Sequence, residues 1–202
     1  MLLRVGLTGG LASGKSVVGR ELQRLGCHLI EADKLGHQAL LPDGEAYAPT
    51  VAAFGPTIVD ADGFIDRKRL GEIVFADPQK LAALNAIVHP AVRRLGDSMV
   101  SAISDGILIY EAAILIETGG YQNFDKLIVA ACPEELQIQR AMARDGVDRE
   151  SVLARLRRQL PLSEKICHAD YLVDTSGTID DTIRQTGEIY HLLRMLRSKA
   201  QS

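Results

Sequence analysis

Residues 9–16 read Gly9-Gly10-Leu11-Ala12-Ser13-Gly14-Lys15-Ser16, and they match the pattern G-x-x-x-x-G-K-[ST] at every position. The apolar run 2–7 before them predicts a buried strand, and the pattern of residues 17–25 after them predicts a helix. This motif binds nucleotide phosphates when it lies between a strand and a helix. The stretch therefore predicts a phosphate loop and a nucleotide di- or triphosphate as its ligand.

The chemistry of such a loop assigns a role to its last residues. Glycines let successive backbone N–H groups converge on one anion, and the positive end of the following helix points at the same place. We expect Lys15 to reach the β- and γ-phosphates and the Ser16 hydroxyl to ligate a bridging Mg²⁺. Residues 9–17, with Val17 at the end, are thus the predicted nucleotide-binding segment.

The composition narrows the class of protein. The chain has 202 residues, of which 47% are hydrophobic and 24% charged, so it is long enough for a core without disulfides. The net charge of -3 argues against a general nucleic-acid binder. Cys27, Cys132 and Cys167 lack metal or disulfide spacing and predict buried or half-buried thiols. No signal peptide or membrane-spanning run is visible, so we expect a cytoplasmic protein. We also expect a monomer or a weak homo-oligomer.

Short apolar runs alternate with helical patterns along most of the chain. Further strands are predicted at 27–31 (ending in Ala32-Asp33), 107–110, 126–131 and 171–174, and helices at 134–144, 149–160 and 179–197. This alternation predicts an α/β fold with three layers and a parallel five-stranded sheet. The nucleotide is expected at the carboxyl ends of the strands.

Two segments interrupt this alternation. Residues 34–105 read as helices broken by turns, with Pro78 and Pro90 each at a position where a helix could begin. The predicted organisation is a nucleotide-binding core of 1–33, 106–140 and 169–202, with a helical substrate domain at 34–105 and a lid at 141–168.

Four carboxylates are candidates for chemistry. Asp33, at the predicted end of a strand, could accept a proton from a substrate hydroxyl, orient Mg²⁺ or cap the next helix. Glu31 lies two residues earlier on the same strand face and could act as a second carboxylate or as an orienting group. Glu111 follows the 107–110 strand, where such proteins place a magnesium-orienting acid, and Glu117 is either a further candidate or a solvated helix residue.

A cluster of arginines is expected to neutralise phosphoryl charge. It contains Arg140, Arg144, Arg149, Arg155, Arg157 and Arg158. Arg140 and Arg144 lie one helical turn apart, and a mobile arginine-bearing segment would exclude water from the nucleotide. The alternative is a solvated surface with Asp145, Asp148 and Glu150 as partners. His89-Pro90, predicted to join two helices, is either a turn or a contact to a second substrate.

In the order and spacing of several motifs the chain resembles the dephospho-coenzyme A kinases. The family's G-L-T-G-G-I-G-S-G-K-S-T is matched by residues 6–17, its D-A-D by Glu31-Ala32-Asp33 and its H-P by His89-Pro90. Its P-L-L-F-E is similar to residues 113–117 and its Q-x-x-R-x-x-x-R-D to residues 137–145. The motifs D-G-x-[LI]-D-R-x-x-L (62–70), R-x-x-x-Q (155–159) and A-D (169–170) are present too.

The resemblance implies phosphorylation of the ribose 3′-hydroxyl of dephospho-coenzyme A by ATP, with Mg²⁺. It implies catalytic roles for Asp33, Lys15 and Arg140. It implies nucleotide contacts from Arg140, Arg144 and Thr175, and substrate contacts from Thr8, Asp33, His37, His89 and Glu117. The chain departs from the family pattern at Val17 (for Thr), Glu31 (Asp), His37 (Arg), Ala113 (Pro) and Thr175 (Asn).

Two other functions fit the same loop. A nucleoside or nucleotide monophosphate kinase would share the core and need a different acceptor site. A GTP-dependent switch would need an N-K-x-D motif to read guanine, and Asp125-Lys126-Leu127 lacks both the Asn and the following Asp.

Overall fold

The computed structural model describes residues 1–199, which divide into two compact units. The core unit comprises residues 1–31 and the chain from residue 103 onward, and the helical unit comprises residues 32–102. The core unit contains the phosphate loop. The chain passes from the core unit to the helical unit directly after the second strand.

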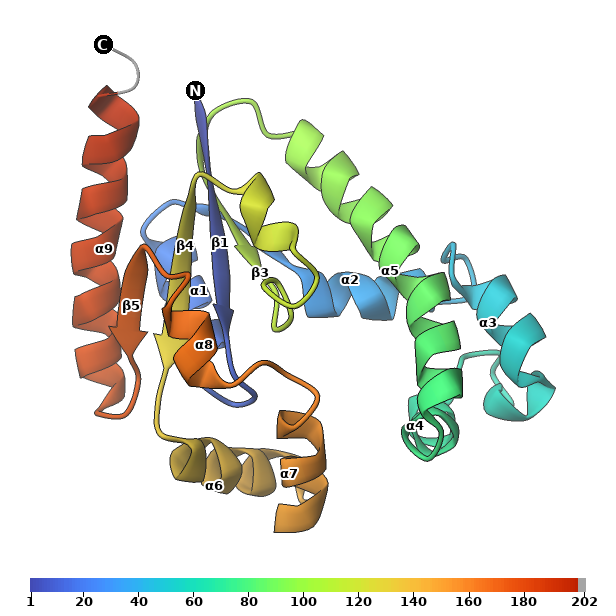
Figure 1. The fold of residues 1–202 in the computed structure, drawn as a ribbon. Coiled ribbons are helices and arrows are strands. Elements are labelled where there is room, and N and C mark those ends of the chain that lie inside the picture. Colours follow the sequence, from blue (N-terminus) through green and yellow to red (C-terminus); the bar gives the residue numbers. More distant parts are fainter. Residues whose placement is uncertain (200–202) are drawn as a thin grey trace. The chain divides into compact units, whose positions relative to one another are not determined.

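The core unit is built on a parallel sheet of five strands, as predicted. The strands lie in the order β2-β3-β1-β4-β5, which places β1 at the centre (Figure 1). Their bounds are β1 (Leu2–Gly9), β2 (His28–Glu31), β3 (Gly106–Glu111), β4 (Lys126–Ala131) and β5 (Tyr171–Asp174). Because every pair is parallel, all carboxyl ends meet at one edge of the sheet.

Helices cover both faces of this sheet and make the predicted three layers. Helices α1 (Lys15–Arg24) and α9 (Ile179–Lys199) pack on one face. There Val18, Leu22 and Leu193 contact alternate strand residues such as Val5 and Ile128. Over the other face lie α8 (Leu162–Ile166) and the short 3-10 helix η2 (Gly120–Asn123) (Figure 1).

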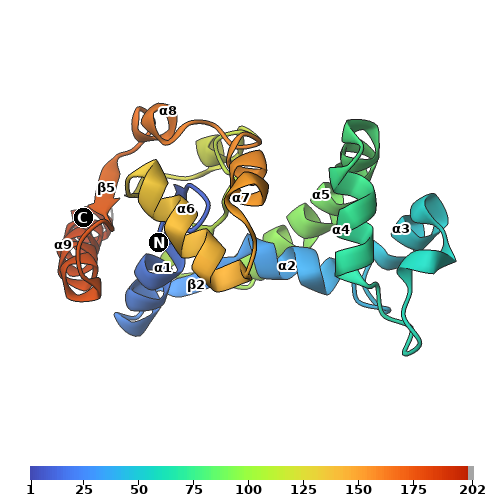
Figure 2. The ribbon, with the colours of Figure 1, turned by 90° about the horizontal axis from the view of Figure 1, so that it is seen from below.

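Two further helices of the core unit follow β4. Helix α6 (Glu134–Asp145) begins with two acids in its first turn, and α7 (Arg149–Leu156) is capped by the Asp148 side chain. Figure 2 shows them side by side at the carboxyl edge of the sheet. Val152 of α7 is buried against Ile138 and Ala141 of α6, so an apolar contact holds the pair together.

The helical unit has its own small apolar core. It contains α2 (Ala32–Ala39), α3 (Tyr47–Phe54), the 3-10 helix η1 (Pro56–Ile58), α4 (Arg67–Phe75) and α5 (Pro78–Ser101). Ile58, Leu70 and Val74 are buried in this core. The side chains of Asp66 and Asp77 accept backbone N–H bonds and so define where α4 and α5 begin.

Three expectations about local structure are wrong. Strand β2 ends at Glu31, so Asp33 does not end a strand and is the second residue of α2. His89 and Pro90 do not join two helices, because both lie inside the continuous α5. Cys27 and Cys132 are buried as expected, but Cys167 is exposed. Burial raises the pKa of the Cys27 thiol to about 12, which makes that thiol unreactive.

Among residues 1–199, no helix has both the length and the apolar character needed to cross a bilayer.

The interior proline of α5 gives a stability prediction. Pro90 lacks the N–H that would bond to the carbonyl of Ala86, and its ring disfavours helix continuation. Pro90→Ala should raise the unfolding free energy of the helical unit by about 1–3 kcal/mol, measured by urea unfolding followed by far-UV circular dichroism.

Pro78→Ala is the matched control, because Pro78 occupies the start of the same helix, where proline is well tolerated. It should change the unfolding free energy by less than about 1 kcal/mol. Equal effects of the two substitutions would show that the interior position carries no special penalty.

Candidate nucleotide-binding site

The phosphate loop lies at the carboxyl edge of the sheet. It leaves β1 at Gly9 and enters α1 at Lys15, after Gly14 has taken the left-handed conformation with φ 85°. Strands β3 and β4 flank β1, so Glu111 and Ala131, at their ends, lie at the same edge. The backbone of the sheet alone therefore places the start of the loop at this edge, next to the ends of β3 and β4.

Close backbone approach explains the first glycine of the loop. A Cβ added at Gly9 would collide with the carbonyl oxygen of Ala130 and lie 2.5 Å from the Ser13 hydroxyl. Ala12, at the tip of the loop, has φ 53°, which favours glycine, and the family pattern has glycine there. The loop therefore tolerates one mildly strained residue but no side chain at position 9.

Lys15 points its ammonium group into the loop. The side chain is 9% exposed, and Nζ donates hydrogen bonds to the carbonyls of Gly9 (3.4 Å) and Gly10 (3.0 Å). A buried cation within a ring of backbone groups attracts anions strongly because little water screens it. This arrangement is suited to phosphate.

The Ser13 hydroxyl marks the same place. Ser13 is fully buried, and its Oγ has no hydrogen-bond partner among residues 1–199. A buried hydroxyl without a partner costs free energy unless a ligand supplies one. The phosphate loop therefore holds both a cation and an unsatisfied polar group.

Oxygen ligands gather beside the start of α1. The Ser16 hydroxyl donates to Glu111 Oε1 at 3.1 Å, and Glu111 is opposite Glu31 in the register of β3 and β2. These oxygens suit Mg²⁺ chemically. No cluster of three or more His, Cys, Asp or Glu able to hold a metal occurs within residues 1–199. A magnesium ion here would need phosphate oxygens and water to complete its coordination.

Thr175 braces the loop from the end of β5. It is 3% exposed, and its hydroxyl lies 2.7 Å from the Ser13 carbonyl oxygen and 3.1 Å from that of Ala131. Its own carbonyl accepts a hydrogen bond from Arg140 at 2.8 Å. The structure thus brings Thr175 and Arg140 together with the phosphate loop, and the Thr175 side chain supports the loop backbone.

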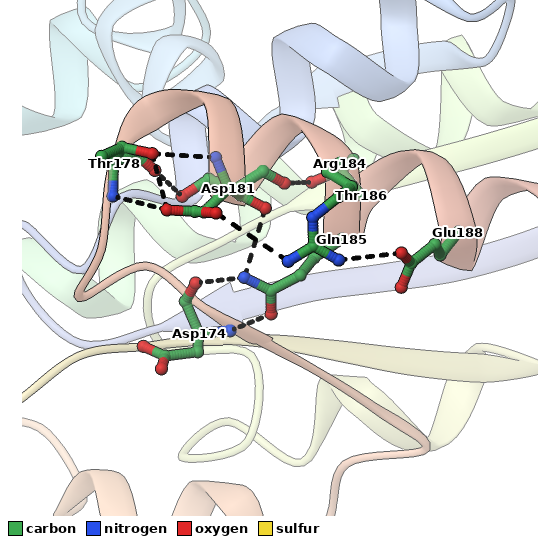
Figure 3. A network of polar contacts seen from close by, with 8 residues as sticks. Asp174, Thr178, Asp181, Arg184, Gln185, Thr186 and Glu188 are labelled. Atoms are coloured by element: carbon green, nitrogen blue, oxygen red, sulfur yellow. Dashed lines mark hydrogen bonds and ion pairs between the residues drawn. The ribbon is translucent and has the colours of Figure 1, made fainter.

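Gln185 of α9 binds the backbone of Asp174, the residue before Thr175. Its side-chain amide accepts from the N–H of Asp174 (3.0 Å) and donates to the carbonyl of Asp174 (2.8 Å), as Figure 3 shows. The first turn of α9 is further tied by bonds between Thr178 and Asp181. The turn that carries Thr175 is therefore fixed on both sides. The sequence pattern gave no indication of the Gln185 contact.

Arg144 has a different partner from Arg140, although the two share a helix. Arg144 donates to both carboxylate oxygens of Asp145, at 2.7 and 3.0 Å, and Arg155 donates to the same carboxylate at 2.6 Å. Hydrogen bonds from Arg144, together with those from Arg155, hold the pKa of Asp145 well below its usual range. In this arrangement Arg144 and Arg155 face an acid of their own segment.

Glu117 is not a solvated helix residue. It lies between β3 and η2, and its Oε1 is 2.7 Å from the ammonium of the fully buried Lys165. Lys165 also donates to the Ala113 carbonyl at 2.7 Å, which accepts from the Thr8 hydroxyl at 3.3 Å. Thr8 and Glu117 therefore belong to one network beside the loop. Sequence reasoning missed Lys165, because no motif marks it.

The remaining candidates lie in the helical unit. Asp33 is exposed in the first turn of α2, where the helix dipole favours a carboxylate, and His37 follows one turn later. Partial desolvation lowers the pKa of His37 and the charge of Arg67 lowers it further, while Asp33 opposes them. His37 is therefore biased towards its neutral form. His89 is exposed on α5.

These features define a class of protein: a phosphate-loop nucleotide-binding protein of the α/β type. A solved structure of shikimate kinase from Acinetobacter baumannii shares this fold, with a TM-score of 0.58 at 16% identity over 96% of this chain and 94% of that chain. A solved structure from Thermus thermophilus has a TM-score of 0.80 at 33% identity, covering 95% of this chain and 97% of that one.

The sequence comparisons specify the family. The sequence model of dephospho-CoA kinase matches residues 3–181. The dephospho-CoA kinase of Geobacter sulfurreducens is 42% identical over 189 residues, which cover 92% of this chain and 96% of the relative. The chain belongs to the dephospho-CoA kinase family, and it is a kinase.

The close approach at Gly9 predicts a loss of nucleotide binding. Gly9→Ala would force Cβ against the backbone of β4, so the loop must shift. Its N–H groups would then no longer converge on one anion. ATP affinity, measured by isothermal titration calorimetry, should fall at least tenfold, about 1.4 kcal/mol.

Gly187→Ala is the matched control, because Gly187 lies inside α9 and has no atom within 4 Å of an added Cβ. This change should leave ATP affinity unaltered and stabilise the helix by up to about 1 kcal/mol. Unchanged ATP affinity in Gly9→Ala would contradict the steric account of the loop.

Proposed function

We propose that this protein transfers the γ-phosphoryl group of ATP to the ribose 3′-hydroxyl of dephospho-coenzyme A, giving coenzyme A and ADP, the last step of coenzyme A synthesis. One observation carries the proposal: a phosphate loop with a buried Lys15 stands in a chain that matches the dephospho-CoA kinase family over residues 3–181. The loop supplies the donor site, and the family supplies the acceptor.

On the donor side, ATP phosphates would replace backbone carbonyls as partners of Lys15. Hydrogen bonds to a charged phosphate are roughly twice as strong as those to a neutral carbonyl, so the exchange is favourable. The Ser13 hydroxyl would gain a partner at the same time. Arg140, whose guanidinium already bonds the Thr175 carbonyl, would add positive charge where the transferred group becomes more negative.

Mg²⁺ fits the oxygen groups beside Lys15. Ser16 would ligate it, and Glu111, already 3.1 Å from the Ser16 hydroxyl, would orient it directly or through water. When bound, Mg²⁺ neutralises charge on the β- and γ-phosphates. Asp33 is a further candidate to orient the ion.

On the acceptor side, Asp33 is the proposed general base. Its carboxylate would accept the proton of the 3′-hydroxyl as the hydroxyl oxygen bonds to the γ-phosphorus. The bond from that phosphorus to the bridging oxygen breaks, and ADP leaves with the electron pair. Thr8, His37, His89 and Glu117 are the proposed substrate contacts, and the helical unit would receive the pantetheine arm.

Segment 141–168 is the proposed lid. It carries most of the arginine cluster, and Arg144 and Arg155 could exchange Asp145 for phosphate oxygens when ATP is bound. A closed lid would exclude water and so limit wasteful ATP hydrolysis. We also place the enzyme in the cytoplasm, whose reducing conditions suit its three free thiols.

The acceptor panel tests the proposed function. The purified protein is incubated with ATP, Mg²⁺ and, separately, dephospho-coenzyme A, AMP, CMP and adenosine, and ADP formation is followed by a coupled assay. ADP should form fastest with dephospho-coenzyme A. Faster turnover of AMP, CMP or adenosine would instead identify a nucleoside or nucleotide monophosphate kinase.

Asp33→Asn tests the base. The variant keeps the shape of the side chain but cannot take the proton, so kcat should fall about 10²–10⁴-fold while the Kd for ATP stays within threefold. Asp43→Asn, a change at an exposed carboxylate of the same unit, is the control and should keep normal kcat. If Asp33→Asn turns over at a near-normal rate, Asp33 is not the base and only stabilises the first turn of α2.

A further inference from the structure

Lys165 is a fully buried lysine, with 0% of its side chain exposed. Lysine is almost never fully buried unless it is paired. Its ammonium donates to the Ala113 carbonyl and to Glu117 Oε1, both at 2.7 Å. The ammonium itself is enclosed by protein, so Lys165 must act through its two partners.

Both partners connect Lys165 to the surroundings of the phosphate loop. The Ala113 carbonyl also accepts from Thr8, which directly precedes Gly9. The neighbouring Ala112 donates its N–H to the carbonyl of Leu7 at 3.0 Å. The short segment after β3 is thus tied to the last residues of β1, and Lys165 is bonded to that segment.

Glu117, which also follows β3, makes a second connection to the part of the chain that contains Lys165. Its Oε1 accepts from the backbone N–H of Leu160 at 3.0 Å as well as from Lys165. One carboxylate oxygen therefore holds residues 160 and 165 together. We call these contacts of Glu117 and Ala113 with residues 160–165 the distal anchor.

A separate contact holds the other end of residues 149–166, the segment that contains α7 and α8. Val152 of α7 is buried in a cluster with Leu11 of the phosphate loop and Ile138 of α6. Segment 149–166 is therefore attached twice, once at the tip of the loop and once at the distal anchor. Arg155, Arg157 and Arg158 lie between the two attachments.

We propose that Lys165 is a positioning residue that, through Glu117 and Ala113, fixes the distal end of the arginine-bearing segment beside the phosphate loop. The inference rests on the proposed function for its kinetic consequence. Without the distal anchor, the backbone of residues 157–160 would lose its attachment to Glu117 and Ala113. Fewer molecules would then hold the arginines where charge develops during phosphoryl transfer.

The test is a double-mutant cycle on the intact protein with Lys165→Met, Glu117→Gln and the double variant. Removing Lys165 alone leaves a largely buried carboxylate without its cation, so this variant is also expected to melt at a lower temperature. The double variant removes both charges, and its melting temperature should recover. All assays are run well below the lowest melting temperature in the set.

Two readouts separate positioning from stability. Amide hydrogen exchange in residues 157–166 should accelerate at least tenfold in Lys165→Met and in the double variant. With dephospho-coenzyme A as acceptor, kcat should fall at least tenfold in both, while the Kd for ATP changes by less than threefold. Because Lys165 acts through Glu117, the two losses should not add. The kcat of the double variant should be no lower than that of the less active single variant.

Lys126→Met is the matched control. Lys126 pairs with Asp170 at 2.6 Å, but at the first residue of β4, on the opposite edge of the sheet. It should leave kcat and exchange in 157–166 within twofold of wild type. The proposal is overturned if exchange and kcat of the folded Lys165 variants stay within twofold of wild type, or if Lys126→Met lowers kcat equally.

Failure of the proposed function would give a different result. The wild-type protein would then bind ATP without turning over dephospho-coenzyme A. The exchange readout would still show whether Lys165 anchors residues 157–166.

Discussion

The site depends on a close backbone contact at the end of the central strand. Gly9 lies so near the carbonyl of Ala130 that no side chain fits between them. This contact sets the direction in which the chain leaves β1, and hence where the loop N–H groups and Lys15 point. Since β1 has a parallel neighbour on each side, the position of the loop is fixed by the hydrogen bonds of the whole sheet.

Later parts of the core unit then complete what β1 begins. Thr175, after β5, binds the carbonyl of Ser13, and Gln185 of α9 fixes the residue before Thr175. Lys165, near the end of α8, is bonded to the segment that binds Thr8. Thr175 therefore contacts the loop directly, while Gln185 and Lys165 hold residues beside it. Such rigidity is what electrostatic catalysis requires, because donors fixed in advance need not reorganise during the reaction.

Much of this architecture was predictable from the sequence for physical reasons. The buried strands of a parallel sheet are continuous apolar runs, so β4 and β5 were predicted with their observed bounds, 126–131 and 171–174. The phosphate loop was predictable because its chemistry demands particular residues at fixed spacing. Glu111 was recognisable as an acid at a strand end, and the structure places it against Ser16.

The errors and omissions involve contacts that local patterns do not encode. Proline is a weak guide inside a long helix, because packing of residues such as Ala91 keeps α5 continuous through Pro90. Asp33 was predicted at the end of a strand but lies in the following helix. The end of β2 and Asp33 are only two residues apart, and sequence patterns do not resolve boundaries that finely. The bond from Lys165 to Ala113 joins residues 52 positions apart, and no periodicity or motif links them.

We propose that Lys15 binds the phosphates of ATP and that Asp33 takes the proton of the accepting hydroxyl. A crystal structure with a non-hydrolysable ATP analogue, Mg²⁺ and dephospho-coenzyme A tests it most directly. The account predicts the γ-phosphate at Lys15 and the ribose 3′-hydroxyl within hydrogen-bond distance, about 3 Å, of the Asp33 carboxylate. A 3′-hydroxyl bound away from Asp33, or phosphates bound outside the loop, would contradict it.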